Sequence, residues 1–208
     1  MIDKSRILFD SQIRFENKTK FISGSDEAGR GAMAGPIVVA SVILPNDYQN
    51  PLIRDSKKLS KKQRELLFEE IKAIAISYAI EIIDASDVDI LNPKQASRVG
   101  MVNSIMNLKP KPVVSLIDAE KIVIENYNCL PFIKGDDLSQ SIAAASILAK
   151  TTRDNIMIEY AKVYPEYNFD LHKGYCVKEH VEKTKKFGVL PIHRKSYKPI
   201  KDILENNF

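Results

Sequence analysis

The sequence predicts a mixed α/β domain, and three observations lead to that expectation. Strand-like apolar segments come early in the chain and alternate with helix-like segments later. Helix-start signals are clear: Ser60 and Gln63 have the spacing of a capping box, and Pro93 follows Asn92 as a first-turn proline does. From about residue 165 onward, the pattern is mainly helical. We therefore expect a mixed sheet flanked by helices, with a helical C-terminal part.

Each expected element follows from a local pattern. The segments 20–25 and 37–44 are apolar and strand-like, with a glycine-rich turn between them, and 76–83 alternates as a half-buried strand does. Gly188 provides a stop for the last clear helix. Helices are expected over 60–75, 92–108, 139–160 and 177–187, and a further short strand over 113–117.

Length and composition are those of one globular domain. The 208 residues are 44% hydrophobic and 28% charged, so we expect a single domain over 1–208 with a substantial core. No apolar run reaches about 18 residues, and the N-terminus has no leader-like core, so we expect no membrane segment and a cytoplasmic protein. Cys129 and Cys176 form neither a disulfide framework nor a zinc cluster. A monomer is the default expectation.

Basic residues gather toward the C-terminus, although the net charge of the chain is only +4. Between residues 173 and 201, nine Lys or Arg stand against two Glu. Such an excess beside an acidic centre suits the backbone of a nucleic acid. The alternative is a solvated helix face whose charges pair four residues apart.

The most informative segment combines adjacent carboxylates with a glycine turn. Asp26 and Glu27 follow an apolar strand, where they offer oxygen ligands to a hard divalent cation. Gly29 and Gly31 let the backbone approach a ligand closely, and Arg30 between them is suited to phosphate. The combination indicates phosphoryl chemistry on a polyanion. The alternative, for this segment alone, is an ordinary surface turn.

Further carboxylates stand where other elements begin or end. Asp118 ends a short strand, and Asp136 lies just before the long helix. Together with Asp26 and Glu27, they would converge on one point from three elements. Such a cluster repels itself unless cations occupy it, and a pair of Mg²⁺ or Mn²⁺ ions is the natural solution.

Each of these positions also has a structural alternative. Asp118 fits a strand-end turn, and either Asp136 or Asp137 fits a helix N-cap or a first-turn position. Asp154 is a further acidic candidate. A straight helix from Ser139 places it about 22 Å along the axis, too far from Asp136 to share a metal. We therefore leave Asp154 out of the set unless that helix bends.

Taken together, the motifs of the chain resemble those of ribonuclease HII. The matching segments are DEAGRG at 26–31, DSKKLS at 55–60, Asp118, KGD at 134–136, SIAAASILAKTTRD at 141–154, HKGY at 172–175 and HRKSY at 193–197. They follow the order of the family and span about residues 20 to 200. The related ribonuclease HIII has Gly-Thr-Gly at the turn and an added N-terminal domain, so the resemblance is to type HII.

The resemblance implies a ribonuclease H-like fold and a metal-dependent endonuclease. Its substrates would be RNA–DNA hybrids and duplex DNA that contains single ribonucleotides. It would cut on the 5′ side of a ribonucleotide with two Mn²⁺ or Mg²⁺ ions, leaving 3′-hydroxyl and 5′-phosphate ends. The catalytic and metal-binding set would be Asp26, Glu27, Asp118 and Asp136.

The same resemblance implies a set of substrate contacts. Gly29, Arg30 and Gly31 would read the ribose 2′-hydroxyl, the group by which RNA differs from DNA. Tyr175 would stack under the following deoxyribose, the alternative being a half-buried core tyrosine. Phosphates would be bound by Lys58, Arg194, Lys195 and Ser196.

The chain departs from the family pattern in small ways. Residues 32–34 read Ala-Met-Ala where Pro-Leu-Ala is more usual, and Tyr197 stands where Phe is common. Asp137, directly after Asp136, leaves open which of the two faces the metals, although the family spacing favours Asp136.

Two other classes of protein stay open on the residues alone. One is a two-metal DNA exonuclease or phosphatase, which needs the carboxylates but no ribose-reading turn. The other is a non-catalytic module that binds nucleic acid through the basic C-terminal region. The tail, 201–208, contains no evident sliding-clamp motif.

Overall fold

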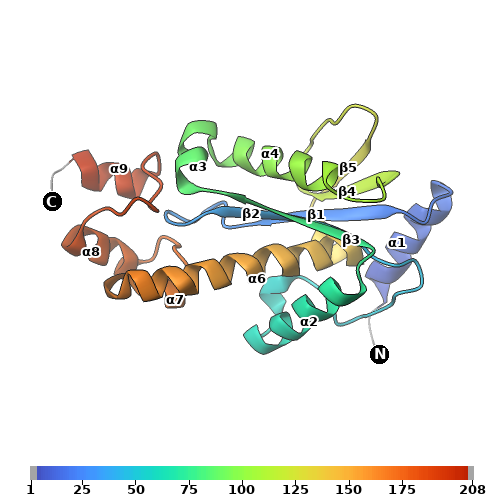
Figure 1. Ribbon diagram of the computed structural model, residues 1–208, viewed down its shortest axis with the longest axis horizontal. Helices are drawn as coiled ribbons and strands as arrows, with labels where there is room; N and C mark the ends of the chain where they lie inside the picture. The colour runs from blue at the N-terminus through green and yellow to red at the C-terminus, as the bar shows by residue number, and fades with distance from the viewer. Residues whose placement is uncertain (1–3, 206–208) are drawn as a thin grey trace.

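A five-stranded mixed sheet forms the middle layer of the molecule (Figure 1). The computed structural model describes residues 4–205. The strands are β1 (Ile22–Ala28), β2 (Ile37–Ile43), β3 (Ser77–Ile83), β4 (Val114–Asp118) and β5 (Asn128–Phe132). Their order is β3-β2-β1-β4-β5, with antiparallel pairing from β3 to β1 and parallel pairing from β1 to β5. This mixed sheet confirms the fold class that the sequence predicts.

Strand β1 runs further than the sequence pattern indicates. The apolar pattern ends near Ser25, but the strand continues to Ala28 because β2 pairs with it along this stretch, Asp26 opposite Ala40 and Glu27 opposite Val39. The expectation that the two carboxylates follow the strand is therefore wrong. They are part of it, so both backbones are fixed by the sheet.

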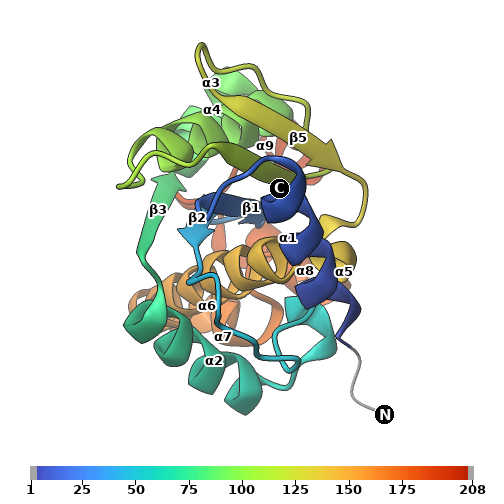
Figure 2. The same ribbon diagram turned by 90° about the vertical axis from the view of Figure 1, so that its right-hand side faces the viewer.

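Helices cover both faces of the sheet (Figures 1 and 2). The long helix α6 (Gln140–Val163) lies against β1 and β2 on one face, and α4 (Pro93–Met106) lies against β2 and β3 on the other. The remaining helices described are α1 (Ser5–Glu16), α2 (Lys61–Ile74), α3 (Ala85–Leu91), α5 (Gly135–Leu138), α7 (Phe169–His172), α8 (Lys178–Phe187) and α9 (Lys198–Glu205). Two 3₁₀ turns are η1 (Ser56–Lys58) and η2 (Pro165–Tyr167).

The helix-start signals in the sequence act as expected. The hydroxyl of Ser60 accepts from the backbone N–H of Gln63, whose side chain accepts from the N–H of Ser60, so α2 opens with a capping box. Asn92 caps α4, and Pro93 is its first residue. Ser139 caps α6. These caps fix where α2, α4 and α6 begin.

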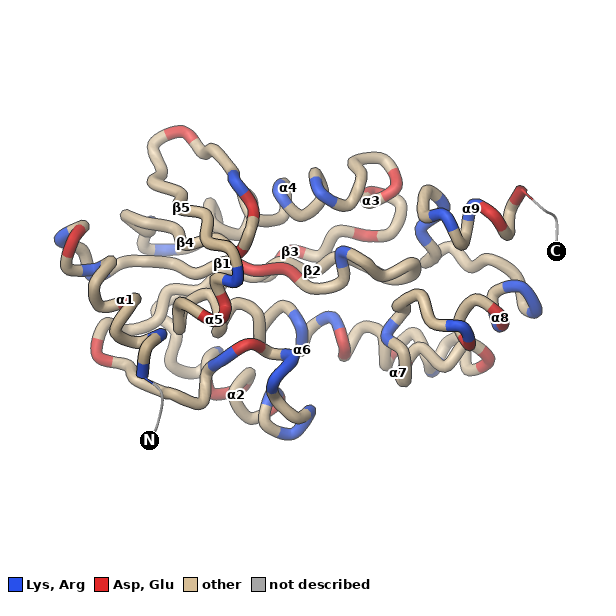
Figure 3. Tube along the Cα trace, turned by 180° about the vertical axis from the view of Figure 1, so that it is seen from behind, with Lys and Arg blue, Asp and Glu red and all other residues tan. Residues whose placement is uncertain are grey.

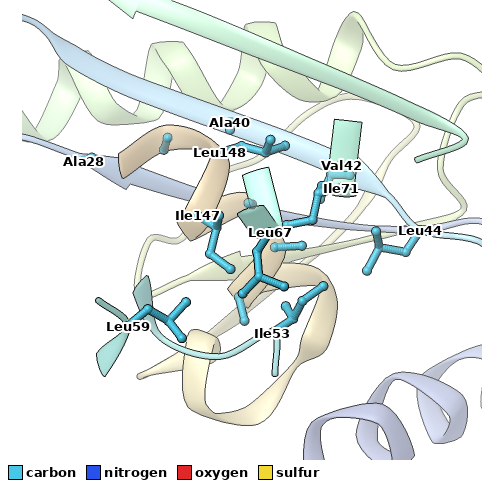
Figure 4. Packing of buried hydrophobic residues seen from close by; sticks show 14 of the residues in the cluster. Ala28, Ala40, Val42, Leu44, Ile53, Leu59, Leu67, Ile71, Ile147 and Leu148 are labelled. Atoms are coloured by element: carbon cyan, nitrogen blue, oxygen red, sulfur yellow. The ribbon is translucent and has the colours of Figure 1, made fainter. Parts of the chain in front are cut away.

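The core between the sheet and α6 is apolar and tightly packed (Figure 4). Val42 of β2, Ile147 of α6 and Ile71 of α2 belong to one buried cluster. Helix α6 and β1 approach most closely at Gly24, where a Cβ atom would lie 2.1 Å from the carbonyl carbon of Ser141. Any larger residue at Gly24 would push the helix away from the sheet. This contact places α6 directly beneath the carboxylate-bearing end of β1.

The sequence pattern missed several elements because apolar periodicity does not mark them. Helix α1 buries Arg6, Asp10 and Arg14 alongside Ile7 and Ile13, so polar residues interrupt its apolar stripe. Strand β5 is only half buried and contains Pro131, and both features hide a strand from sequence analysis. Helices α3, α5, α7 and α9 are too short for a clear period.

The C-terminal part is helical from η2 onward, as the sequence predicts. Residues 1–3 and 206–208 lie outside the described residues, and the expectations about a leader and about a sliding-clamp motif in the tail extend into them. Within 4–205, no helix combines the length and the apolar composition needed to cross a bilayer. A single domain over 1–208 stays a prediction.

Asp10 provides a test of how α1 is attached. Its carboxylate accepts from the hydroxyl of Ser139 (2.6 Å) and from the N–H (2.9 Å) and hydroxyl (2.7 Å) of Ser141. Asp10→Ala leaves these buried donors unsatisfied, so the free energy of unfolding should fall by about 1–3 kcal/mol in urea denaturation. Gln12→Ala, on the exposed side of α1, should change it by less than about 0.5 kcal/mol. Equal effects would contradict this account.

Candidate active site

The predicted carboxylates meet at one end of the sheet. Asp26 and Glu27 lie on β1, and Asp118 ends β4, the parallel neighbour of β1. Parallel pairing brings these strand ends to the same edge. Asp136 follows in α5, and its segment is tied to β4 because the N–H of Gly135 donates to Oδ1 of Asp118 at 2.7 Å.

Burial and mutual repulsion raise the pKa of each of these carboxyl groups. The pKa of Asp26 is raised well above its usual value by burial and by the charges of Glu27 and Asp118. Burial raises the pKa of Glu27 to about 7, with Asp118 adding to the shift and Arg30 opposing it. Burial together with nearby carboxylates raises that of Asp136 to about 6, and burial raises that of Asp118. The cluster thus has a deficit of positive charge.

This deficit is what a divalent cation would remove. Oε2 of Glu27 is buried without a hydrogen-bond partner, so one lone pair of the cluster is uncompensated. Carboxylate oxygens are the donors that Mg²⁺ and Mn²⁺ prefer. Among residues 4–205, no three His, Cys, Asp or Glu side chains already form a metal-binding group. The donor set therefore fits a hard divalent cation, but the side chains are not closed around one.

The turn after β1 is held from beneath by a buried arginine. Gly29 has a φ of +92°, and a Cβ there would lie 1.9 Å from Nε of Arg153. The Arg153 guanidinium donates to the backbone carbonyls of Pro36 (2.9 Å), Ala34 (3.1 Å) and Lys173 (2.9 Å). One fully buried side chain thus joins the turn to the segment that precedes Tyr175.

Arg30 is fixed between two carboxylates. Its guanidinium lies 3.0 Å from Oε1 of Glu27 and 2.8 Å from Oε1 of Glu120, and Arg98 binds the other oxygen of Glu120 at 3.0 Å. Glu120 is buried, with an exposed fraction of 5%. The sequence analysis missed Glu120, and its position two residues after Asp118 is the only signal that pointed to it. Arg30 therefore links the turn to the carboxylate cluster.

Tyr175 lines a cavity together with Asp26 and Glu27, whereas Asp118 and Asp136 are not among the lining residues. The cavity has a volume of about 410 Å³ and is lined by Asp26, Glu27, Ala28, Gly29, Arg30, Gly31, Ser56, Lys57, Ser146, Lys150 and Tyr175. The Tyr175 ring is contacted by two cations, the guanidinium carbon of Arg153 at 5.2 Å and Nζ of Lys150 at 5.7 Å from its centroid. The predicted turn, Asp26, Glu27 and Tyr175 thus share one cavity.

Two buried histidines, His180 and His193, and the partly buried His172 hold the backbone on either side of Tyr175. A carbonyl only accepts, so Nδ1 of His180 donates to the Tyr175 carbonyl at 3.0 Å. Nε2 of His180 then accepts from Nε2–H of His193 at 3.1 Å, and Nδ1 of His193 accepts from the N–H of Leu190 at 2.9 Å. His172 completes the set by accepting from the N–H of Gly174 at 3.1 Å. These bonds are consistent only with neutral imidazoles, each in one tautomer.

The 3₁₀ turn η1 brings an unpredicted lysine to the site. Lys57 lines the cavity, and although burial lowers its pKa, the charges of Asp55, Asp26, Asp136 and Asp118 raise it overall. Its neighbour Lys58 instead pairs with Asp137 outside the cavity. The expected phosphate contact in the DSKKLS segment is Lys58, whereas the lysine that lines the cavity is Lys57.

The open questions about Asp137 and Asp154 have structural answers. Asp136 is 9% exposed beside Asp118, whereas the side chain of Asp137 is 39% exposed and turned to Lys58. Asp154 is engaged by Lys150 at 2.7 Å and by Arg64 at 3.6 Å. Neither Asp137 nor Asp154 therefore belongs to the cluster.

Two of the expected phosphate contacts do not fit the structure. Arg194 is fully buried and donates to the carbonyls of Gly35 and Arg30, both at 3.0 Å, so it supports the turn and cannot reach a phosphate. The hydroxyl of Ser196 donates to Asp89 at 2.6 Å, which occupies its proton. Lys195 is exposed, and its N–H also donates to Asp89. None of these three residues is among those that line the cavity.

The fold is that of solved ribonuclease H structures. The RNase HII of Archaeoglobus fulgidus, solved in complex with PCNA, matches with a TM-score of 0.73 at 24% identity, covering 86% of this chain and 95% of that one. Bst-RNase HIII, solved with Mn²⁺, matches with a TM-score of 0.69 at 19% identity, covering 89% and 70%. At such identities the likeness shows the fold, which is that of ribonuclease H enzymes.

Sequence comparison identifies the family within this class. Residues 23–200 match the family model described as Ribonuclease HII. The ribonuclease HII of Mycoplasma capricolum subsp. capricolum is 56% identical over 200 residues, which covers 96% of this chain and 97% of that protein. The chain belongs to the ribonuclease HII family. It is an endoribonuclease of the ribonuclease H type, from a divalent-metal-dependent family that acts on RNA–DNA hybrids.

The neutral histidines predict a pH dependence of stability. Burial lowers the pKa of His180 to about 3 and that of His193 to about 4, from an ordinary 6.5. Below pH 6.5 the unfolded chain therefore binds more protons than the native one, and the stability that these groups contribute is lost as the pH falls. The His193→Gln variant has no such group at this position, so it does not lose this stability as the pH falls. The difference in free energy of unfolding between wild type and His193→Gln should therefore shrink by about 3 kcal/mol between pH 7 and pH 4.

The measurement is urea denaturation of both proteins across that pH range. Gln12→Ala serves as the control because its difference from wild type should not change with pH. A constant difference for His193→Gln would show that His193 is not held neutral.

Proposed function

We propose that this protein hydrolyses the phosphodiester bond on the 5′ side of a ribonucleotide in a duplex, by two-metal-ion catalysis. The substrates are RNA–DNA hybrids and duplex DNA with single embedded ribonucleotides, and the ends are 3′-hydroxyl and 5′-phosphate. The observation that supports this is the shared cavity, which is lined by Asp26, Glu27, the Gly29–Gly31 turn and Tyr175.

The metal-binding residues in this proposal are Asp26, Glu27, Asp118 and Asp136. Divalent ions held there, Mn²⁺ or Mg²⁺, supply activation of a water nucleophile and stabilisation of the departing 3′ oxygen. The residues themselves contribute position. Asp26 and Glu27 are fixed by the sheet, and the Gly135 N–H holds the carboxylate of Asp118. The carboxyl groups with raised pKa become fully ionised when cations bind among them.

The turn and Tyr175 provide the specificity in this proposal. Gly29 and Gly31 keep side chains away from the backbone, so its polar groups can meet a 2′-hydroxyl, which is both a donor and an acceptor. Arg30 belongs to the turn and stays on Glu27 and Glu120. The ring of Tyr175, backed by Arg153, stacks under the next sugar. Lys57, which lines the cavity, and Lys58, which lies outside it, contact phosphates.

The proposal also covers the setting of the enzyme. Residues 1–208 act as one catalytic domain and as a monomer, without a requirement for a sliding clamp. Both Cys129 and Cys176 are free thiols, which is typical of a reducing compartment, and we place the enzyme in the cytoplasm.

The proposed function makes a prediction about substrate choice. With Mg²⁺ or Mn²⁺, a DNA duplex that contains one ribonucleotide should be nicked on its 5′ side, while an all-DNA duplex of the same sequence should stay intact. End-labelled strands on a sequencing gel locate the nick. Equal cutting of both duplexes would favour a general two-metal nuclease, and binding without any cutting would favour a non-catalytic module.

The second prediction concerns the carboxylates. Asp136→Asn should lower the cleavage rate by roughly 10²-fold or more, because it removes a metal ligand, while duplex affinity is kept. Asp137→Asn is the matched control, since Asp137 faces Lys58, and its rate should stay within about threefold of wild type. The two variants are compared by single-turnover cleavage. The assignment is wrong if Asp137→Asn is the inactive one.

A further inference from the structure

A second cavity adjoins the proposed active site along α6. Its volume is about 300 Å³, and Lys150 lines both cavities. The walls come from the start of α2, from α6, and from Leu171 and Lys173 at the end of α7. Figure 3 shows basic positions, in blue, along α6 and at the start of α2.

The charges around this cavity leave an excess of positive charge. Lys61, Arg64, Lys150 and Lys173 line it, against Glu65 and Asp154. Asp154 is already engaged by Lys150 at 2.7 Å and Arg64 at 3.6 Å, and Glu65 lies 3.8 Å from Lys61. Four cations against two carboxylates leave two positive charges unbalanced.

Lys173 carries much of this excess. Its ammonium hydrogen-bonds the backbone carbonyl of Asp170, a neutral acceptor. Burial lowers the pKa of Lys173, and although Asp154 and Asp170 oppose this, Lys61 and Lys150 lower it further. Gathered ammonium groups of this kind destabilise one another unless an anion lies between them.

Several of the side chains that line the cavity are held in place by contacts within the protein, whereas that of Lys61 is 66% exposed. Nη1 of Arg64 donates to the carbonyls of Ser56 (3.1 Å) and Leu59 (2.7 Å), which anchors it to the turn that carries Lys57. The side chains of Arg64, Lys150 and Asp154 are only 16%, 19% and 12% exposed. The backbone of Lys173 is held by Arg153.

We propose that this second cavity binds a backbone phosphate of the nucleic-acid strand that lies on Tyr175. The inference rests on the proposed function for the choice of ligand. Lys173 is two residues before Tyr175, and Lys150 lies 5.7 Å from the Tyr175 ring, so a strand stacked there passes directly to the excess charge. A phosphate contact of this kind positions the strand without reading its sequence or its sugar.

The experiment measures how duplex binding depends on salt. Two proteins are compared, the double variant Lys61→Gln/Lys173→Gln and the protein with both lysines intact. Both carry Asp118→Asn, which blocks cleavage. Loss of one phosphate contact should reduce the slope of log K against log salt by about 0.9 and lower the affinity at 0.1 M salt roughly tenfold. The loss should be the same for an all-DNA duplex and for one containing a ribonucleotide, because the site does not read the sugar.

Two control variants separate a phosphate contact from a general charge effect or a folding defect. Lys162→Gln removes an exposed lysine at the far end of α6 and should leave the slope unchanged. Lys61→Arg/Lys173→Arg keeps both charges and should retain the slope. An unchanged slope in the double Gln variant, with its thermal unfolding unaltered, would overturn the proposal.

The same duplexes distinguish failure of the subsite from failure of the proposed function. If wild type nicks at the ribonucleotide but the double Gln variant keeps the full slope, the subsite is wrong and the function stands. If the slope falls while wild type cuts neither duplex, the phosphate site is supported and the proposed function is wrong.

Discussion

Repulsion among carboxylates is the constraint on which the rest of the site depends. Parallel pairing of β1 and β4 brings Asp26, Glu27 and Asp118 to one sheet edge, where burial raises the free energy of their charges. Cationic side chains from three segments of the chain lie near these carboxylates. Lys57 comes from η1, Arg30 from the turn and Arg98, through Glu120, from α4. These cations offset part of the charge and leave the remainder for a ligand.

Two buried arginines donate hydrogen bonds to the backbone around the turn. Arg153 and Arg194 are fully buried, and their main partners are carbonyl oxygens of the turn and its surroundings. Carbonyls in an irregular segment have no partner in the same segment, so buried donors must come from elsewhere. Each guanidinium satisfies several of them at once. The turn is therefore held by hydrogen bonds from buried side chains, although it is not part of a strand.

Much of the fold and the identity of the carboxylates could be predicted, because these depend on local patterns. Caps at Ser60 and Ser139 mark helix starts, and an apolar run marks a strand, although Asp26 and Glu27 lie within β1 and do not follow it. The roles of the basic residues could not be predicted. Lys57 and Lys58 are neighbours on one turn and differ only in the direction in which each side chain points.

Long-range contacts account for the other errors. Arg194 looks like a surface cation in the sequence, and its burial depends on carbonyls of residues about 160 positions earlier. Glu120 reaches Arg30 because Ala119 adopts a positive φ of +51°, a conformation that the sequence pattern does not predict. Helix α1 is attached through Asp10 as well as through Phe9 and Ile13, and its buried polar residues interrupt the apolar pattern that would mark it in the sequence.

Because Arg30 is held in place, long-range attraction of a duplex and recognition of its sugars depend on different residues. Because its guanidinium is neutralised by Glu27 and Glu120, the turn presents little net field to an approaching polyanion. Long-range steering must then come from the lysines farther along the chain, whose pull decreases with salt. Contacts at the turn are made only at close range and by uncharged groups. Ionic strength should accordingly change how often a duplex arrives far more than how well its sugars are discriminated after arrival.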